Sequence, residues 1–238
     1  MKVLLNDGLE KEGVQLFQKA GLETDTKRRD LKALIAEIAD FDALVVRSTT
    51  KVTREIIEAG AKGKLKIVGR SGVGYDNIDV EAASEFGVVV KSAPYGSTNA
   101  VAELTMGLIL SASRNISQAH QALKCGVWSK EKLKGRELAY KTLGLLGCGR
   151  IGQKVAQLAH RGFDMEVIGY DIRPCPDSGI KFVTKEEVLK KADYVSIHTG
   201  GKDCLIGEKE LALMKPTAYV INTSRGANID EDALYEAL

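Results

Sequence analysis

The chain has 238 residues, 44% of them hydrophobic, and its 34 basic and 32 acidic residues leave a formal net charge of +2. Such a chain can bury a sizeable core, and its length suits one large or two modest domains. The chain lacks the excess of basic residues that is typical of nucleic-acid-binding proteins, so we expect no nucleic-acid partner. The short cluster from Lys27 to Arg29 is interpreted as a solvated surface turn, with an anion site as the alternative.

The cysteines and the N-terminus narrow the class of protein further. Cys125, Cys148, Cys175 and Cys204 form no Cys-x-x-Cys pair, and no histidine has zinc-finger spacing, so we expect a reduced protein without a metal site. The opening MKVLLNDGLE lacks the apolar core of about 7 to 15 residues that a signal peptide needs. No run approaches the roughly 18 apolar residues of a membrane span. The sequence predicts a cytoplasmic protein without a membrane partner.

Strand-like runs alternate with helical patterns along the first ninety residues. The runs are KVLL (2–5), ALVV (43–46), KIVG (66–69) and VVV (88–90). The helical patterns place apolar faces at Leu9, Gly13, Leu16, Phe17 and Ala20, at Leu31, Leu34, Ile35 and Ile38, and at Ile56, Ile57 and Ala59. This alternation indicates a parallel sheet covered by helices on both faces. Residues 1–94 are therefore predicted to form a small doubly wound, flavodoxin-like domain.

A second domain is predicted after a hinge. The stretch SAPYGSTN (92–99) interrupts the periodicity with Pro94 and Gly96, and a long helical pattern follows from Val101. That helix is interpreted as a core helix or a subunit contact. The strand pattern then restarts at 141–147, 166–171, 181–183, 193–199 and 218–223. Residues 95–238 are therefore predicted to form a second α/β domain with a doubly wound parallel sheet.

The first strand of the second domain runs into a glycine-rich turn. Gly147, Gly149 and Gly152 have G-x-G-x-x-G spacing and open a helical pattern, which is typical of a turn that lays a pyrophosphate on a helix N-terminus. The next strand ends at Asp171, 19 positions beyond Gly152, where a carboxylate can accept hydrogen bonds from a ribose. That carboxylate would repel a 2′-phosphate, so NAD is favoured over NADP. The basic side chain of Arg173, two residues after Asp171, suits a 2′-phosphate, so NADP is the alternative cofactor.

A second glycine stretch, GRSGVGYDNID (69–79), has the spacing G-x-x-G-x-G and is not a cofactor fingerprint. Backbone N–H groups at Gly72 and Val73 can hold a small anion there. The alternative is a plain turn before a helix capped by Asp79.

The chain resembles the D-2-hydroxyacid dehydrogenases over essentially its whole length. The resemblance is carried by an ordered set of motifs: VVRSTTKVT and GRSGVGYDNID in the first domain, then KTLGLLGCGRIG, GYD, HTG and NTSRG in the second. The likeness is greatest to the members that oxidise D-3-phosphoglycerate for serine synthesis. The resemblance implies a substrate domain, a Rossmann NAD domain, and a homodimer formed through residues 97–123. It also implies that the cofactor lies against residues 147–152, including Arg150 and Ile151. Asp171, His198, Thr199, Thr223, Ser224 and Arg225 complete that cofactor set.

The resemblance also assigns substrate contacts. Arg225 is expected to be the catalytic-site arginine, whose guanidinium can hold a substrate carboxylate through two parallel hydrogen bonds. Gly72 and Val73 would meet the same carboxylate. Arg47, Ser48 and Lys51 would meet the far end of a small 2-hydroxy or 2-oxo acid, and two cations suit a phosphate. Gly200 departs from the family, in which proline commonly follows His-Thr.

One catalytic element of the family is not found in these residues. Hydride transfer at C2 needs a partner group that exchanges a proton with the oxygen, and the family takes that histidine and its glutamate from segments after the arginine. We therefore expect residues 1–238 to be a truncated piece that lacks the last strands of its NAD domain and is inactive alone. The alternatives to phosphoglycerate oxidation are a glyoxylate or hydroxypyruvate reductase and a non-catalytic NAD-binding regulatory protein.

Overall fold

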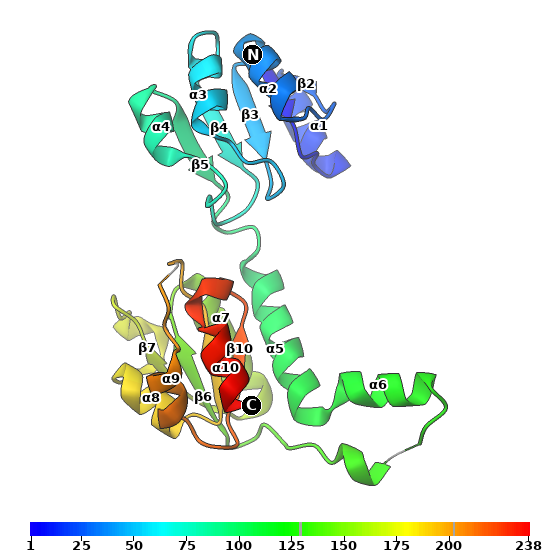
Figure 1. Ribbon diagram of the computed structural model, residues 1–238, viewed down its shortest axis with the longest axis vertical. Coiled ribbons are helices and arrows are strands. Elements are labelled where there is room, and N and C mark those ends of the chain that lie inside the picture. Colours follow the sequence, from blue (N-terminus) through cyan, green and yellow to red (C-terminus); the bar gives the residue numbers. More distant parts are fainter. Residues whose placement is uncertain (129, 202) are drawn as a thin grey trace. The chain divides into compact units, whose positions relative to one another are not determined.

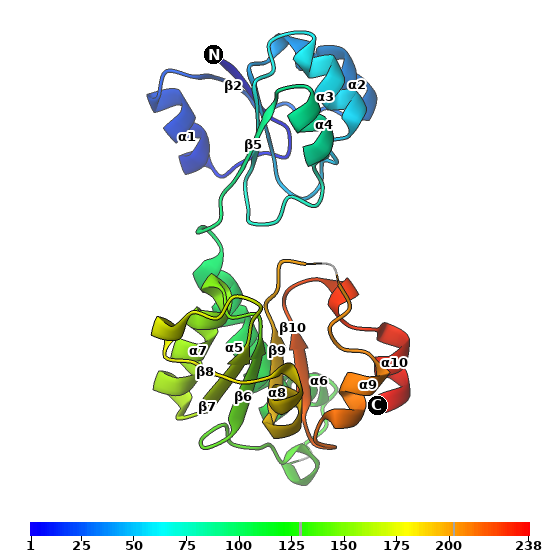
Figure 2. The ribbon, with the colours of Figure 1, turned by 90° about the vertical axis from the view of Figure 1, so that its left-hand side faces the viewer.

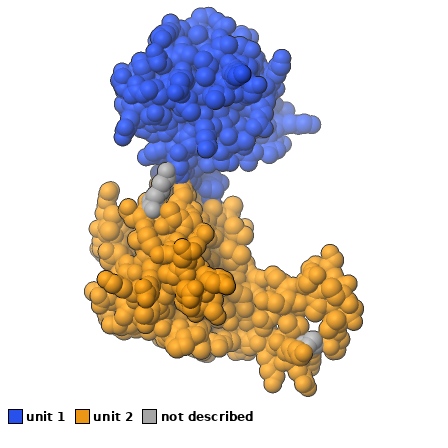
Figure 3. All heavy atoms as spheres, in the orientation of Figure 1, with its two compact units in different colours: residues 1–97 blue, residues 98–238 orange. Residues whose placement is uncertain are grey.

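The chain divides after Ser97 into two units, Met1–Ser97 and Thr98–Leu238 (Figure 3). The computed structural model describes residues 1–128, 130–201 and 203–238. Each unit has its own five-stranded sheet, and every strand pairing in both sheets is parallel. The predicted α/β class with two parallel sheets is confirmed.

The first unit has the strand order β2-β1-β3-β4-β5, which is the doubly wound order of the flavodoxin type (Figure 1). Its strands are β1 (Lys2–Leu5), β2 (Glu23–Asp25), β3 (Ala43–Val46), β4 (Ile67–Arg70) and β5 (Val89–Ser92). Its helices are α1 (Lys11–Lys19), α2 (Leu31–Glu37), the 3-10 turn η1 (Ile38–Asp40), α3 (Arg54–Ala61) and α4 (Val80–Glu85). Asp79 caps α4 by accepting a hydrogen bond from the Ala82 N–H at 2.8 Å, as the alternative interpretation of the second glycine stretch expects.

Side chains of β1 alternate between two cores, so both faces of the first sheet are covered. Leu4 packs into a cluster with residues of α2, α3 and α4, whereas Val3 and Leu5 pack against Val14 and Phe17 of α1. The predicted apolar face of α1 was partly wrong, because Leu16 is exposed. The helix begins only at Lys11, and the partly buried Val14 and Phe17, three positions apart, form the face that packs on the sheet.

Two local predictions in the first unit also need correction. The strand β2 was not predicted, because its three residues Glu-Thr-Asp at the sheet edge carry no apolar alternation. The turn from Lys27 to Arg29 is not wholly solvated. The Arg29 side chain is 8% exposed, pairs with Asp25 at 2.7 Å and Glu37 at 3.0 Å, and lies over the Phe41 ring.

The second unit has the order β10-β9-β6-β7-β8, which corresponds to five positions of the Rossmann order 3-2-1-4-5-6 (Figure 2). Its strands are β6 (Thr142–Leu146), β7 (Glu166–Tyr170), β8 (Lys181–Phe182), β9 (Tyr194–Ile197) and β10 (Tyr219–Asn222). Its α-helices are α5 (Thr98–Arg114), α6 (Ile116–Lys124), α7 (Arg150–Phe163), α8 (Lys185–Lys191), α9 (Glu208–Leu213) and α10 (Glu231–Ala237). Its 3-10 turns are η2 (Lys130–Leu133), η3 (Pro176–Ser178) and η4 (Gly226–Asn228).

The long helical pattern after the hinge forms two helices instead of one. Asn115, with φ of 53°, breaks the chain between α5 and α6. One face of α5 is buried through Ala102, Met106 and Ile109, in a core shared with α7 and β6. The helix α6 leads away from the body of this unit (Figure 1). In the described part of the chain, no helix is both long and apolar enough to cross a membrane.

Candidate active site

The glycine turn after β6 has the geometry that its spacing predicts. Gly147 has φ of +94°, which side chains rarely adopt, and its N–H donates to the Tyr170 carbonyl at 2.9 Å. A Cβ on Gly152 would lie 2.3 Å from the Gly147 carbonyl oxygen, so only glycine allows α7 to start this close to the turn. A Cβ on Gly149 would meet nothing within 4 Å. The first and third glycines therefore shape the turn, and the second leaves space for a ligand.

The helix after this turn offers an anion site. Gly149 is the N-cap of α7, and it has no side chain with which to bond the first-turn N–H groups. Arg150 and Ile151 are in that first turn, where orphan N–H donors and the helix dipole favour a phosphate. The space at Gly149, the uncapped helix start and the adjacent carboxylate of Asp171 fit a dinucleotide.

Asp171 directly follows β7 and is tied to the glycine turn. One carboxylate oxygen accepts the Cys148 N–H at 2.6 Å, and the other accepts the Arg173 N–H at 2.8 Å. These bonds fix the carboxylate beside the turn, and each oxygen retains a lone pair for a ribose hydroxyl. Cys148 itself is buried, and its burial raises the pKa of the thiol to about 12, so this cysteine is a core residue.

His198, after β9, is built into a chain of hydroxyl groups. Nε2 lies 2.9 Å from the Ser196 hydroxyl and Nδ1 lies 3.3 Å from the Thr223 hydroxyl, which in turn is 3.0 Å from the hydroxyl of Thr105 on α5. Burial lowers the pKa of His198 to about 4, so the ring is neutral at physiological pH. Its backbone supports the glycine turn, because a Cβ on Gly147 would lie 2.8 Å from the His198 carbonyl carbon.

Arg225 follows β10 in a loop held by asparagine side chains. Its N–H donates to the Asn228 side-chain oxygen at 3.3 Å, and its carbonyl accepts the Asn222 amide at 2.7 Å. The guanidinium Nη1 donates to the Ser224 carbonyl at 3.1 Å. The neighbouring loop after β9 joins this network, because the Thr199 hydroxyl donates to Asn228 at 3.3 Å. The predicted cofactor residues of the second unit thus gather at one edge of its sheet, where open α/β sheets bind ligands.

In the first unit, an acid and an amide position the loop of Arg47, Ser48 and Lys51. Asp7 accepts the Arg47 N–H at 2.7 Å and the Thr50 N–H at 3.0 Å. Asn77 donates to the carbonyls of Arg47 at 2.9 Å and Thr50 at 2.7 Å. Burial tends to raise the pKa of Asp7, but the hydrogen bonds from Thr50 and Arg47 outweigh burial and lower it. Asp7 is therefore a carboxylate that anchors this loop.

In the second glycine stretch, one of the two N–H groups predicted to hold an anion already has a partner, and a further cation, Arg70, lies beside it. The Gly72 N–H donates to the Arg70 carbonyl at 2.8 Å, so this N–H is already used inside the chain. The Arg70 guanidinium occupies the place of a Gly72 Cβ, and its buried Nε has no hydrogen-bond partner among the described residues. Arg70 ends β4 and its backbone pairs with Val46, the residue before Arg47. Arg70 was not predicted as a site residue, although it ends a strand beside the loop that carries Arg47.

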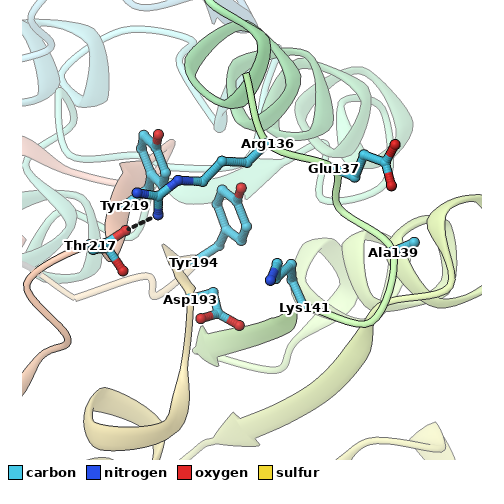
Figure 4. Close-up of a pocket in the computed structure, with 8 residues that line it drawn as sticks. All are labelled: Arg136, Glu137, Ala139, Lys141, Asp193, Tyr194, Thr217 and Tyr219. Carbon is cyan, nitrogen blue, oxygen red and sulfur yellow. Dashed lines mark hydrogen bonds between the residues drawn. The ribbon is translucent and has the colours of Figure 1, made fainter. Parts of the chain in front are cut away.

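A separate pocket of about 450 Å³ lies where the strands of the second sheet begin, at the edge opposite the predicted cofactor residues (Figure 4). It is lined by Arg136, Glu137, Ala139, Lys141, Asp193, Tyr194, Thr217 and Tyr219. Its lining has two basic and two acidic side chains, so their formal charges cancel. The rings of Tyr194 and Tyr219 stack with centroids 5.1 Å apart. It contains none of the predicted site residues. Within residues 1–128, 130–201 and 203–238, no cluster of three or more His, Cys, Asp or Glu side chains could hold a metal ion.

Comparison with known proteins assigns the family. Residues 106–238 match the family model described as D-isomer specific 2-hydroxyacid dehydrogenase, NAD binding domain. The hydroxypyruvate reductase of Thermotoga maritima is 45% identical over 99% of this chain and 78% of its own length. The chain belongs to the D-isomer specific 2-hydroxyacid dehydrogenase family. The second unit therefore contains the NAD-binding domain of that family.

Two further relatives agree with this assignment. The D-3-phosphoglycerate dehydrogenase of Methanocaldococcus jannaschii is 45% identical, and the match covers 100% of this chain and 46% of the relative. The chain thus spans about half the length of that enzyme. Among solved structures, D-lactate dehydrogenase from Aquifex aeolicus, complexed with NAD and lactic acid, has a TM-score of 0.84 and 30% identity over 100% of this chain and 73% of its own.

Proposed function

We propose that the protein is an NAD-dependent dehydrogenase that interconverts D-3-phosphoglycerate and 3-phosphohydroxypyruvate. The observation that carries the dehydrogenase proposal is the grouping of the glycine turn, Asp171 and Arg225 at one edge of the second sheet. Support for the phosphorylated substrate comes from the cations Arg47, Lys51 and Arg70 in the first unit. The 45% identity to a D-3-phosphoglycerate dehydrogenase points to the same substrate.

In the proposed mechanism, NAD, when bound, would supply the acceptor for the hydride on C2 of the substrate. The first turn of α7 holds the pyrophosphate, and Asp171 accepts hydrogen bonds from the adenosine ribose. Thr199, Thr223 and Ser224 line the same edge. Arg225 holds the substrate carboxylate through two parallel hydrogen bonds and so orients C2.

The proton of the substrate hydroxyl needs a separate acceptor. His198 is not proposed for this role, because its pKa of about 4 and its two hydroxyl partners make it a structural, neutral ring. His120 is exposed on α6, and His160 is bonded to the Met165 carbonyl at 3.2 Å. None of the three histidines is therefore proposed as the acid/base group.

The protein is also proposed to form a homodimer through residues 97–123. Large apolar side chains on the outer faces of the two helices support this contact, namely Leu104, Leu108, Ile116 and Leu123. A two-fold contact through α5 and α6 would bury them. Light scattering on the purified protein measures the mass of the assembly. A monomer at micromolar concentration contradicts the proposal.

The substrate proposal is tested by comparing 3-phosphohydroxypyruvate with hydroxypyruvate in the intact protein, with NADH as the reductant. We expect a higher kcat/KM for the phosphorylated acid, because its phosphate meets the cations of the first unit. A higher kcat/KM for hydroxypyruvate favours the second candidate, a hydroxypyruvate or glyoxylate reductase. The 45% identity to a hydroxypyruvate reductase over 78% of its length supports that candidate. NADH binding without reduction of either acid would favour a regulatory role.

A further inference from the structure

One buried side chain in the second unit connects the loops that carry the cofactor and substrate residues. Asn228 is 1% exposed. Its amide oxygen lies 2.8 Å from the Ser224 hydroxyl and 3.3 Å from both the Arg225 N–H and the Thr199 hydroxyl, all three of which donate to it. Its amide nitrogen donates to the carbonyls of Gly201 at 3.0 Å and Asp203 at 2.8 Å. Both halves of the amide are therefore fully used.

The backbone of Asn228 strengthens the same connection. Its N–H donates to the Arg225 carbonyl at 3.0 Å, and its carbonyl accepts the N–H groups of Leu205 at 2.9 Å and Ile206 at 3.1 Å. A parallel bridge between Ile206 and Ile229 continues this pairing. The loop after β9 and the loop after β10 are thus joined through one residue.

The loop after β9 depends on this tie more than an ordinary loop would. Gly200 and Gly201 are adjacent in it, and glycine gives the backbone more freedom than any other residue. A Cβ on Gly200 would meet nothing within 4 Å, so neighbouring atoms do not restrain that position. An apolar replacement of Asn228 would leave the carbonyls of Gly201 and Asp203 without this donor, which destabilises the loop.

We propose that Asn228 is a positioning residue that fixes the loops after β9 and β10 together and so orients Arg225 toward the substrate carboxylate. This inference rests on the proposed role of Arg225 and identifies what fixes its geometry. Asn228 touches neither substrate nor cofactor in this account. It acts through the backbone of Arg225, which it bonds at both the N–H and the carbonyl. A small displacement of that backbone weakens a two-point grip on a carboxylate.

The experiment compares Asn228→Leu, Asn228→Asp and Ser113→Ala in the intact protein, with hydroxypyruvate as substrate and NADH as reductant. Asn228→Leu is expected to raise KM at least tenfold and to raise the NADH dissociation constant by less, because the first turn of α7 and Asp171 lie outside the two loops. Asn228→Asp keeps the acceptor oxygen that faces Arg225, so its KM should be intermediate. Ser113 is an equally buried polar residue of α5, remote from the loops, whose hydroxyl bonds Ile109 and Tyr194. Ser113→Ala should lower thermal stability and leave KM unchanged.

A double-mutant cycle shows whether Asn228 acts through Arg225. Asn228→Leu should change kcat/KM by less than twofold when Arg225 is already alanine, because the group that it positions is gone. Equal effects in both backgrounds would overturn the inference. If Arg225→Ala alone leaves KM and kcat unchanged, the proposed function fails at Arg225.

Hydrogen exchange gives a readout that does not need turnover. Asn228→Leu should speed amide exchange in residues 203–206 and 223–229, with no change in α7. Unchanged exchange in both loops contradicts the positioning role even if the enzyme is active, so the two proposals can fail separately.

Discussion

The two sheets end in loops of different chemistry at their carboxyl edges. At the edge of the first unit, Arg47, Lys51 and Arg70 follow or end strands, and the carboxylate Asp7 anchors their loop. At the edge of the second unit, neutral amides anchor the loops, and the site combines a helix N-terminus with Asp171 and Arg225. Cations suit a phosphate, whereas a helix start and a carboxylate suit a dinucleotide.

We therefore expect the two sheets, which are built alike, to bind different ligands: a phosphate at the first edge and a dinucleotide at the second. A parallel sheet fixes where its loops lie, and the side chains in the loops decide which ligand binds. The substitutions below change one edge at a time.

The largest effect is expected at Arg225. Arg225→Ala removes the two-point grip on the carboxylate, and kcat/KM for the 2-oxo acid should fall by about a thousandfold. Arg225→Lys keeps the charge but cannot form two parallel hydrogen bonds, so a loss above about tenfold should remain. Steady-state kinetics with NADH measure both variants. A variant with unchanged kcat/KM contradicts the assigned role.

A smaller effect is expected at Arg70 in the first unit. Arg70→Leu removes a cation at the end of β4, and kcat/KM for 3-phosphohydroxypyruvate should fall by about 10- to 100-fold. Hydroxypyruvate, which has no phosphate, should lose less. Arg54→Leu is the control, because Arg54 forms an exposed ion pair with Glu85 on α3 and α4. Equal losses for the two acids would show that Arg70 does not meet the phosphate.

At Asp171 we expect about a tenfold change in NADH binding. Asp171→Asn removes the charge that accepts hydrogen bonds from the ribose, which raises the NADH dissociation constant, and it should also weaken the preference for NADH over NADPH. Fluorescence titration with both cofactors measures this. Asp177→Asn, at an exposed acid of η3, is the control. An unchanged ratio of the two dissociation constants argues against the ribose contact.

The smallest effect concerns the stability of the first unit and its dependence on pH. The hydrogen bond from Arg29 is the main cause that lowers the pKa of Asp25 from 3.8 to about 2. Because the pKa is lower in the folded state, this stabilisation is complete above about pH 4 and is lost as the pH falls toward about 2. Asp25→Asn should lower the free energy of unfolding by about 1 kcal/mol at neutral pH. Urea unfolding at several pH values tests this, and a difference that persists at pH 2 contradicts it.

Much of the fold could be predicted because apolar runs and glycine spacing are local signals. The strand runs, the turn at Gly147 and the cap at Asp79 each follow from a few neighbouring residues. Glu23–Asp25 gave no such signal, since an edge strand can be polar, and the break at Asn115 depends on a single left-handed residue. Hydrophobic periodicity does not register either feature.

The site was less predictable wherever a side chain acts through partners distant in sequence. Asn228 bonds Thr199, Gly201 and Asp203, between 25 and 29 positions away, and no local pattern indicates this. The buried state of Arg29 depends on Asp25, Glu37 and Phe41 together. Arg70 could have been found from its place at a strand end.

The most direct test of the central claim is NAD reduction by the intact protein with the D- and L-isomers of 3-phosphoglycerate. The family is D-isomer specific, and a carboxylate fixed by Arg225 presents only one face of C2 to the cofactor. We predict NADH formation with the D-isomer and none with the L-isomer. NADH formation with the L-isomer, or with neither isomer, would contradict the account.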